Sequence, residues 1–363
     1  MKKHFKRPLS LLLAILLCIG MLPVSASAAD LTGSMSMIDI KGRDHALSSS
    51  LPAPFGGYAS EKYTMLRITD SSTGATKTAY CLELGISTYY QEQYQPSADY
   101  PQFSQEQKEL INAVLTLGYN TDTGVKYRGS PEDEYIATQI LVWLIAHKQL
   151  GTQYENQIVS EFTVNSPGAK AVFTKLRKAV MDYRTIPSFA CGDSKYASSH
   201  TYELKYNAQT GKYETTLTDS NGVLSEFSFS QPGVSFARTG NQLKVSSEKT
   251  SFSTVSGEKK LPSSIAGVVK GASRYWLNEH YQNVVTFEVG GEPLPVKAYF
   301  GLEVKAGHLK IVKTSEDGKV SGLPFHVSGS GVEKDVSTGS DGTVQTNNLP
   351  AGTYTVTEKT PGQ

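Results

Sequence analysis

The spacing of hydrophobic residues changes twice along this chain, and each change predicts a different kind of structure. From about residue 30 to 100, short alternating runs of hydrophobic and polar residues are separated by turn-forming residues. Segments 63–68 and 77–84 follow this pattern and flank a turn at 71–74, so both are predicted to be β-strands. The next region, to about residue 187, shows the wider spacing that is typical of helices.

Three helices are predicted in this second region because each has its own start signal. Ser104 is a cap residue with Gln107 three positions later, which is the pattern of a capping box. Ser130 is followed by Pro131, and Ser166 is also followed by a proline, a residue that is favoured at the first helical position. The second helix carries apolar residues on all sides, so we expect it to be buried.

From about residue 188 to 306 the pattern returns to alternating strands, beginning with a hairpin-like pair at 202–206 and 213–218. This region is most simply an all-β sandwich, with a short helix at 276–281 as an addition. A further strand at 309–313 starts a third unit. The predicted fold class is therefore an α+β domain of β-strands plus a helical subdomain, then an all-β sandwich, then a partial Ig-like β domain.

The first 28 residues have the pattern of a secretory signal peptide. A basic start precedes an apolar core at 11–22 and a small-residue site, so we expect cleavage between Ala28 and Ala29. That core is short for a membrane span, and no membrane contact is expected of the mature chain. The predicted segments are a signal peptide at 1–28, a first domain at 29–187, a sandwich at 188–306 and a last, incomplete domain at 307–363.

Composition excludes several classes of function. The net charge is +1 with acidic and basic residues interspersed, so there is no basic stripe for nucleic acid. The seven histidines are scattered and form no ligand spacing with the cysteines, so no metal site is predicted. The chain has no glycine-rich phosphate loop, and no cofactor is expected.

Two residues in the first domain point to chemistry. Cys81 ends the predicted strand, and Gln139 lies in the middle of the buried helix at 136–146. Tyr135, Gln139 and Trp143 are four residues apart and therefore share one face of that helix. A buried amide without a partner costs on the order of 1–3 kcal/mol, so Gln139 is expected to be hydrogen-bonded or chemically used.

The pair Tyr80-Cys81, followed by Thr138-Gln139 and then Trp143, resembles the signature of the thioester domains of Gram-positive surface adhesins. The resemblance implies an internal thioester between Cys81 and Gln139, with ammonia as the leaving group. It also implies a shielded pocket, for which the candidate residues are Tyr80, Tyr135, Thr138 and Trp143. One position departs from the pattern, because Leu141 stands where adhesin thioester domains usually carry alanine.

By the same resemblance, the partner is a host extracellular protein, such as fibrinogen, that presents a lysine amine. The amine attacks the thioester, forms an amide with Gln139 and frees Cys81. Such a protein is a single-turnover reactive binder and not an enzyme. It is expected to be secreted and to lie on the cell surface, anchored to the wall within a longer parent protein.

The last unit resembles the prealbumin-like repeat domains of Gram-positive adhesins and pilins, from the strand at 309–313 to the Tyr-Thr-Val-Thr-Glu strand that ends at Glu358. Such repeats often carry a Lys–Asn isopeptide bond, which makes Lys313 and Glu358 the candidate lysine and catalytic acid. An apolar site would favour the neutral amine and the protonated acid that this chemistry needs. The strand that would carry the acceptor is missing, so this copy is expected to lack the bond.

Two alternatives remain open at this point. Cys81 can be the nucleophile of a peptidase-like or transglutaminase-like enzyme with His147 as its base. The chain can instead be a passive β-rich stalk in which Cys81 and Cys191 form a disulfide, as an exported protein with two mature cysteines allows.

Overall fold

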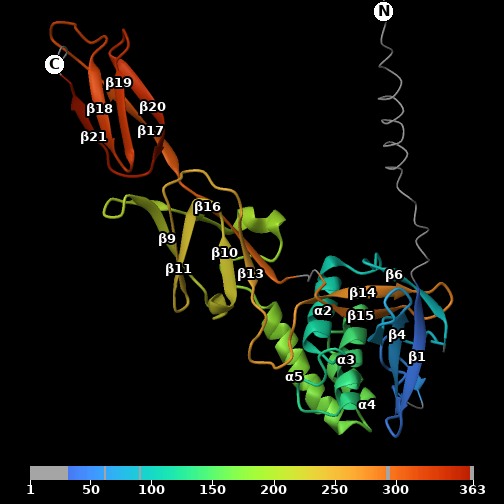
Figure 1. The fold of residues 1–363 in the computed structure, drawn as a ribbon. Coiled ribbons are helices and arrows are strands. Elements are labelled where there is room, and N and C mark those ends of the chain that lie inside the picture. Colours follow the sequence, from blue (N-terminus) through green and yellow to red (C-terminus); the bar gives the residue numbers. More distant parts are fainter. Residues whose placement is uncertain (1–31, 61–62, 90, 292–294, 360–363) are drawn as a thin grey trace, which may run out of the picture.

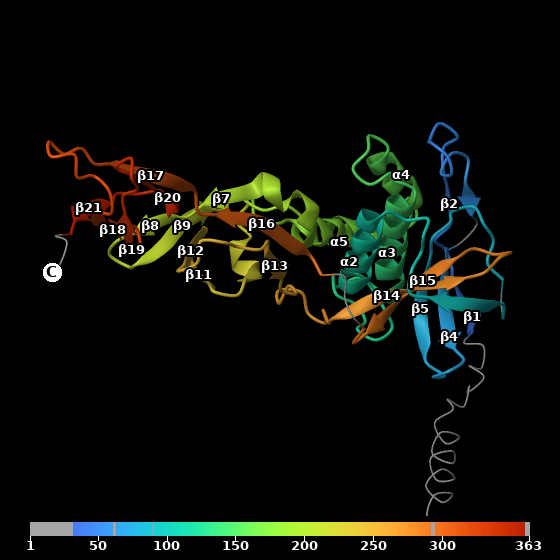
Figure 2. The same ribbon diagram turned by 90° about the horizontal axis from the view of Figure 1, so that it is seen from above.

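The computed structural model describes residues 32–60, 63–89, 91–291 and 295–359. Three units follow one another in an elongated arrangement (Figures 1 and 2). The predicted signal peptide, with its predicted cleavage site at Ala28 and Ala29, lies outside the described residues. Among the residues described, no helix is long and apolar enough to cross a membrane.

The first unit is built on a closed six-stranded sheet in the order β1-β4-β5-β15-β14-β6. Its strands are β1 Gly33–Ile40, β4 Tyr63–Asp70, β5 Thr76–Cys81, β6 Gln93–Ser97, β14 Gly271–Leu277 and β15 Val284–Val289. A small hairpin of β2 His45–Ala46 and β3 Ala59–Ser60 is attached to it. The alternating burial of β4 reflects its hydrophobic pattern, with one face on the core.

The sequence-based domain boundaries differ from this arrangement in one respect. Strands β14 and β15 belong to the segment assigned to the sandwich at 188–306, yet β15 pairs with β5, with Val284 opposite Cys81. The predicted short helix at 276–281 is also wrong, because Trp276 lies in strand β14. Only long-range pairing closes the sheet, and local sequence patterns do not encode which distant strand is the partner. The first unit is therefore discontinuous in sequence.

Four helices stand against this sheet (Figure 1). They are α2 Gln105–Leu117, α3 Pro131–Ala146, α4 Glu155–Phe162 and α5 Pro167–Arg184. The capping box of Ser104 and Gln107 is confirmed, and the Ser130 side chain accepts a hydrogen bond from the backbone N–H of Asp133, 3.1 Å away. The sequence did not predict α4, since this short helix has no side-chain cap.

The second unit consists of two four-stranded sheets, and the third of a two-stranded and a three-stranded sheet. The second contains η1 Ser194–His200, β7 Thr201–Glu203, β8 Lys205–Asn207, β9 Lys212–Thr218, η2 Leu224–Glu226, β10 Phe227–Ser230, β11 Val234–Thr239, β12 Gln242–Ser247, β13 Val255–Lys259 and β16 Lys297–Glu303. The third contains β17 Ala306–Val312, β18 Pro324–Gly329, β19 Val332–Ser337, β20 Thr343–Pro350 and β21 Thr355–Glu358. The predicted hairpin at the start of the second unit corresponds to β8 and β9.

Buried polar contacts join consecutive units. The Lys259 amine is buried and donates to the carbonyl oxygens of Asp182 and Thr185 at the C-terminal end of α5, over 2.7 and 2.9 Å. A cation at this end of a helix complements the helix dipole. Between the second and third units, the Tyr213 hydroxyl donates to the carbonyl oxygen of Ser330 over 2.8 Å.

Candidate functional site

The spacing of residues on α3 matches the spacing of residues on β5. Four residues of helix advance about 6 Å and two residues of strand about 6.6 Å, so residues i and i+4 of a helix can face residues j and j+2 of a strand. The Tyr135 hydroxyl donates to the carbonyl oxygen of Ala79 over 3.2 Å. Gln139 lies four residues after Tyr135 on the helix, and it contacts Cys81, which lies two residues after Ala79 on the strand. Each side chain therefore meets its own backbone group on β5.

Gln139 satisfies both backbone polar groups of Cys81. The Cys81 N–H donates to Oε1 of Gln139 over 2.8 Å, and Nε2 of Gln139 donates to the Cys81 carbonyl oxygen over 2.9 Å. Strand β4 no longer pairs with β5 at this level, since their register ends at Leu66 and Ala79. The Gln139 amide makes the two backbone hydrogen bonds to Cys81 that a neighbouring strand would otherwise make, and only 2% of Gln139 is exposed.

Burial keeps the Cys81 thiol protonated. Desolvation raises the pKa of the thiol well above its ordinary value, and the negative charge of Glu83 raises it further. The free thiolate is the reactive nucleophile, so deprotonation has to accompany attack at this site. The N–H that points at Oε1 of Gln139 polarises the carbonyl that the sulfur would attack.

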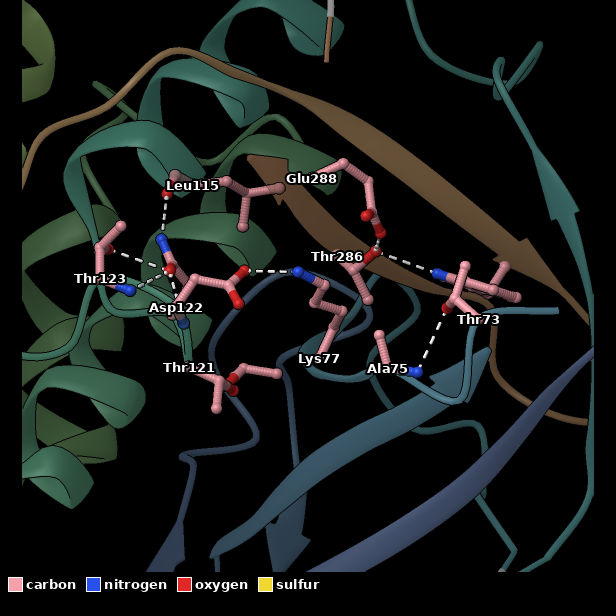
Figure 3. Close-up of polar contacts among 12 residues, drawn as sticks. Thr73, Ala75, Lys77, Leu115, Thr121, Asp122, Thr123, Thr286 and Glu288 are labelled. Atoms are coloured by element: carbon pink, nitrogen blue, oxygen red, sulfur yellow. Dashed lines mark hydrogen bonds and ion pairs between the residues drawn. The ribbon is translucent and has the colours of Figure 1, made fainter. Parts of the chain in front are cut away.

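The loop after α2 fixes β5 against the helices. Lys77 and Asp122 form an ion pair of 2.7 Å, and the backbone N–H of Thr123 donates to the side chain of Asn120 over 2.9 Å (Figure 3). Three residues further along β5, the Tyr80 hydroxyl donates to the carbonyl oxygen of Tyr119. These contacts set the position of the strand that ends in Cys81.

A cavity of about 370 Å³ opens beside Cys81 and Gln139. None of the described residues that line it is an aspartate, glutamate, lysine or arginine. The lining residues are His45, Tyr58, Tyr63, Thr64, Leu66, Cys81, Gly85, Ile86, Ser87, Thr88, Gln139, Trp143 and Gln282. A cavity of this size admits an extended side chain such as that of lysine, but it offers an ammonium group no carboxylate from these residues.

Only one of the four pocket residues predicted from sequence lies on the cavity wall, and it is Trp143. Tyr80 and Tyr135 stack on each other behind the site, with ring centroids 5.0 Å apart. Thr138 faces α2, where its hydroxyl accepts from the N–H of Tyr119 over 3.2 Å. These three residues support α3 and β5 from the core, and the wall is completed by other residues.

The aromatic residues in and behind the cavity wall come largely from elements that the sequence did not connect with the site. Phe162, on the unpredicted helix α4, stacks on Trp143 with ring centroids 5.2 Å apart. His45 packs on the other side, with its ring centroid 4.7 Å from that of Phe162 and 4.4 Å from that of Tyr63. The aromatic residues in the region before residue 70 were visible in the sequence, but nothing local tied them to Cys81.

The burial of His45 predicts a specific loss of stability in acid. Burial lowers the pKa of His45 to about 4, although a hydrogen bond with the Arg43 backbone and the charge of Asp44 both act to raise it. Between about pH 6.5 and 4 the unfolded chain therefore binds a proton that the folded chain does not. We expect protonation of His45 in the unfolded chain to lower the free energy of unfolding, measured with urea, by on the order of 3 kcal/mol between pH 7 and pH 4. His45→Phe should remove that part of the pH dependence, and an unchanged pH dependence in the variant would contradict the assignment.

The rim of the cavity is held by the turn between β14 and β15. Both carboxylate oxygens of Glu83 accept from Asn283, from its backbone N–H over 2.9 Å and from its side chain over 3.0 Å. The neighbouring Gln282 lines the cavity and donates to the Glu83 carbonyl oxygen. A residue some two hundred positions from Cys81 thus completes the site.

The residues of the two alternative functions are engaged elsewhere. Nε2 of His147 accepts from the backbone N–H of Leu84 over 3.2 Å, and burial lowers the pKa of the ring. Cys191 lies in the second unit, where its backbone pairs with Tyr299 and its sulfur is 3.3 Å from the Tyr299 carbonyl oxygen. Cys81 and Cys191 are both free cysteines in the part of the chain described.

In the third unit the structure brings Lys313 and Glu358 together. Their side chains form an ion pair of 2.8 Å, and they remain 28% and 42% exposed. The apolar surroundings that the sequence analysis assumed for this pair are therefore not present. The expectation that this copy lacks the isopeptide bond stays a prediction.

Comparison with known proteins agrees with the two sequence signatures. Residues 78–181 match the family model described as a thioester domain, and residues 307–362 match that of a prealbumin-like fold domain. A search of the curated proteins found no match. A thioester domain followed by a prealbumin-like domain confirms the family resemblance and the α+β fold class predicted from sequence.

Two solved structures are similar at low identity. The thioester domain of the Staphylococcus aureus TIE protein is 16% identical with a TM-score of 0.41, over 75% of this chain and 98% of that chain. The Bacillus anthracis TIE protein is 16% identical with a TM-score of 0.34, over 91% of this chain and 60% of that chain.

Proposed function

We propose that this protein is a bacterial surface adhesin that attaches itself covalently to amines of a host protein through a Cys81–Gln139 thioester. The observation that carries the proposal is the double hydrogen bond between the Gln139 amide and the Cys81 backbone, beside a cavity that an amine can enter. The match of residues 78–181 to a thioester domain supports the same chemistry.

Thioester formation exchanges one bond to the Gln139 side-chain carbonyl carbon for another. The Cys81 sulfur attacks that carbon, the C–N bond breaks, and the thiol proton leaves with the amide nitrogen as ammonia. The oxyanion that forms on Oε1 lies within hydrogen-bond reach of the Cys81 N–H, 2.8 Å away. The buried surroundings of the pair, with Cys81 only 9% exposed, limit the access of water to the acyl group.

Attack by an amine then completes the attachment. The amine nitrogen bonds to the acyl carbon, the C–S bond breaks, and Cys81 is released as a thiol. Gln139 is consumed as an amide to the partner, so each molecule reacts once and the protein is a reactive binder and not an enzyme. A partner that docks beside the cavity and delivers a lysine gains the advantage of proximity, which can reach effective molarities on the order of 10⁵ M or more.

The same proposal extends to the binding partner of the protein, its location and its anchoring. The amine is that of a lysine on a host extracellular protein, with fibrinogen as the first candidate to test. Export through the segment 1–28 and display on the cell wall within a longer parent protein are consistent with an adhesin. The prealbumin-like unit at 307–362 would then hold the reactive unit away from the cell.

The intact mass of the mature protein tests this proposal against both alternatives. We expect the mass to be lower than the sequence mass by one ammonia, and methylamine should then add once and expose one new thiol. Cys81→Ala and Gln139→Ala are the matched controls, and each should retain its full sequence mass and take up no amine. A loss of two hydrogens would support the disulfide-bonded stalk instead, and an unmodified mass would support the enzyme.

A further inference from the structure

His45 is a buried polar side chain on the wall of the reactive cavity. The residue is 5% exposed, and neither ring nitrogen forms a hydrogen bond of ordinary geometry with a described residue, although the Arg43 backbone is near enough to raise the pKa of the ring. Its ring is enclosed by the rings of Tyr58, Tyr63 and Phe162, at centroid distances of 5.8, 4.4 and 4.7 Å. Buried polar groups are normally paired, so an unpaired imidazole in a cavity wall requires an explanation.

The proposed chemistry needs a group that moves a proton inside this cavity. An amine that attacks the thioester carries a proton that it must lose as the new C–N bond forms. The Cys81 sulfur that leaves must gain a proton, because burial strongly favours its thiol form. A residue that accepts the first proton and delivers the second balances both changes.

Other candidates among the described residues near the site are poorly suited to this transfer. The described lining contains no carboxylate and no amine. Burial raises the pKa of Tyr63 well above its ordinary value, which makes its hydroxyl a poor proton donor. Nε2 of His147 is already engaged with the N–H of Leu84. Among the lining residues, His45 has a side chain that can both accept and return a proton near neutral pH, and its ring nitrogens are not held by a hydrogen bond of the kind that His147 makes.

We propose that His45 is the proton-transfer residue of this site, which takes a proton from the attacking amine and returns it to the Cys81 sulfur. The inference rests on the proposed thioester. Formation of the thioester with release of ammonia is the reverse of attack by ammonia, so the same residue serves both steps in opposite directions. The χ2 torsion of histidine is broad, so the ring can present either nitrogen to the cavity.

Burial also keeps His45 in the form that this role requires. Because its pKa is lowered to about 4, the ring is neutral at physiological pH and has a lone pair to offer. A neutral imidazole is compatible with the aromatic enclosure, whereas a charged one would lose its hydration there. The amine is therefore met by an acceptor and not by a repelling charge.

Two substitutions separate proton transfer from packing. His45→Phe keeps a ring between Tyr63 and Phe162, and His45→Gln keeps a hydrogen-bond acceptor that does not take up a proton. We expect both variants to react with methylamine about a hundredfold or more slowly than wild type, the usual range for loss of a general base. His308→Phe, which makes the same change at an exposed histidine of strand β17 in the third unit, should react at the wild-type rate.

Rescue by free imidazole provides the deciding measurement. His45→Ala opens space for imidazole, which should restore ammonia loss, methylamine uptake or both in proportion to its concentration, each followed by intact mass. Wild-type rates in the His45 variants would overturn the inference. So would a slow His45→Ala protein that imidazole does not accelerate, because that result indicates a packing role. A wild-type mass without ammonia loss would overturn the proposed function itself.

Discussion

Gln139→Ala is expected to abolish covalent capture of the partner while leaving reversible docking in place. Wild-type protein incubated with a lysine-bearing host protein such as fibrinogen should give a product that survives boiling in detergent. The variant lacks the carbonyl carbon that becomes the acyl group, so the yield of that product should fall to background. Electrophoresis in detergent measures the product, and surface binding measurements follow the docking.

A matched comparison identifies the bond. Cys81→Ala should lose the detergent-resistant product to the same extent as Gln139→Ala, whereas Cys191→Ala should retain it because Cys191 lies in the second unit against Tyr299. Peptide mapping should locate the linkage between Gln139 and a partner lysine. A detergent-resistant product formed by Gln139→Ala would mean that other residues make the bond and that the site is assigned incorrectly.

Glu134→Ala is expected to destabilise the first unit more than other single changes near the site. Glu134 is 1% exposed, and its carboxylate accepts from the backbone N–H groups of Lys126, Tyr127 and Gly129 at 2.6, 2.5 and 3.4 Å. Removing it leaves these donors unpaired beside the N-terminus of the helix that carries Gln139. An unpaired buried group costs about 1–3 kcal/mol, and these three donors are only partly buried, so we expect the lower part of that range for each and a loss on the order of 3–6 kcal/mol in urea unfolding.

Glu132→Ala is the control for the charge itself. Glu132 lies in the same first turn of α3, where an acidic residue interacts favourably with the helix dipole. Its removal should change the free energy of unfolding by less than about 1 kcal/mol. Equal effects of the two substitutions would show that the helix dipole, and not the three hydrogen bonds to the backbone, accounts for the role of Glu134.

Some features of this protein were determined by sequence that is local to them. The start of α2 followed from Ser104 and Gln107, because a capping box satisfies backbone groups within four residues. The burial of α3 followed from apolar residues around its whole circumference. The pairing of Cys81 with Gln139 was suggested by two short signatures, and the match of helix and strand spacing explains how they meet.

Other features were decided only by the tertiary structure. Strand β5 pairs with β15, some two hundred residues away, as well as with its neighbour β4, and through β15 Gln282 reaches the cavity rim. His45 meets Phe162 only because strand β2 packs against helix α4, more than a hundred residues later in the chain. Hydrophobic periodicity specifies which face of an element is buried, but not which element buries it, since apolar attraction has no direction. The contact between Cys81 and Gln139 could therefore be predicted from sequence, whereas the cavity around it could not.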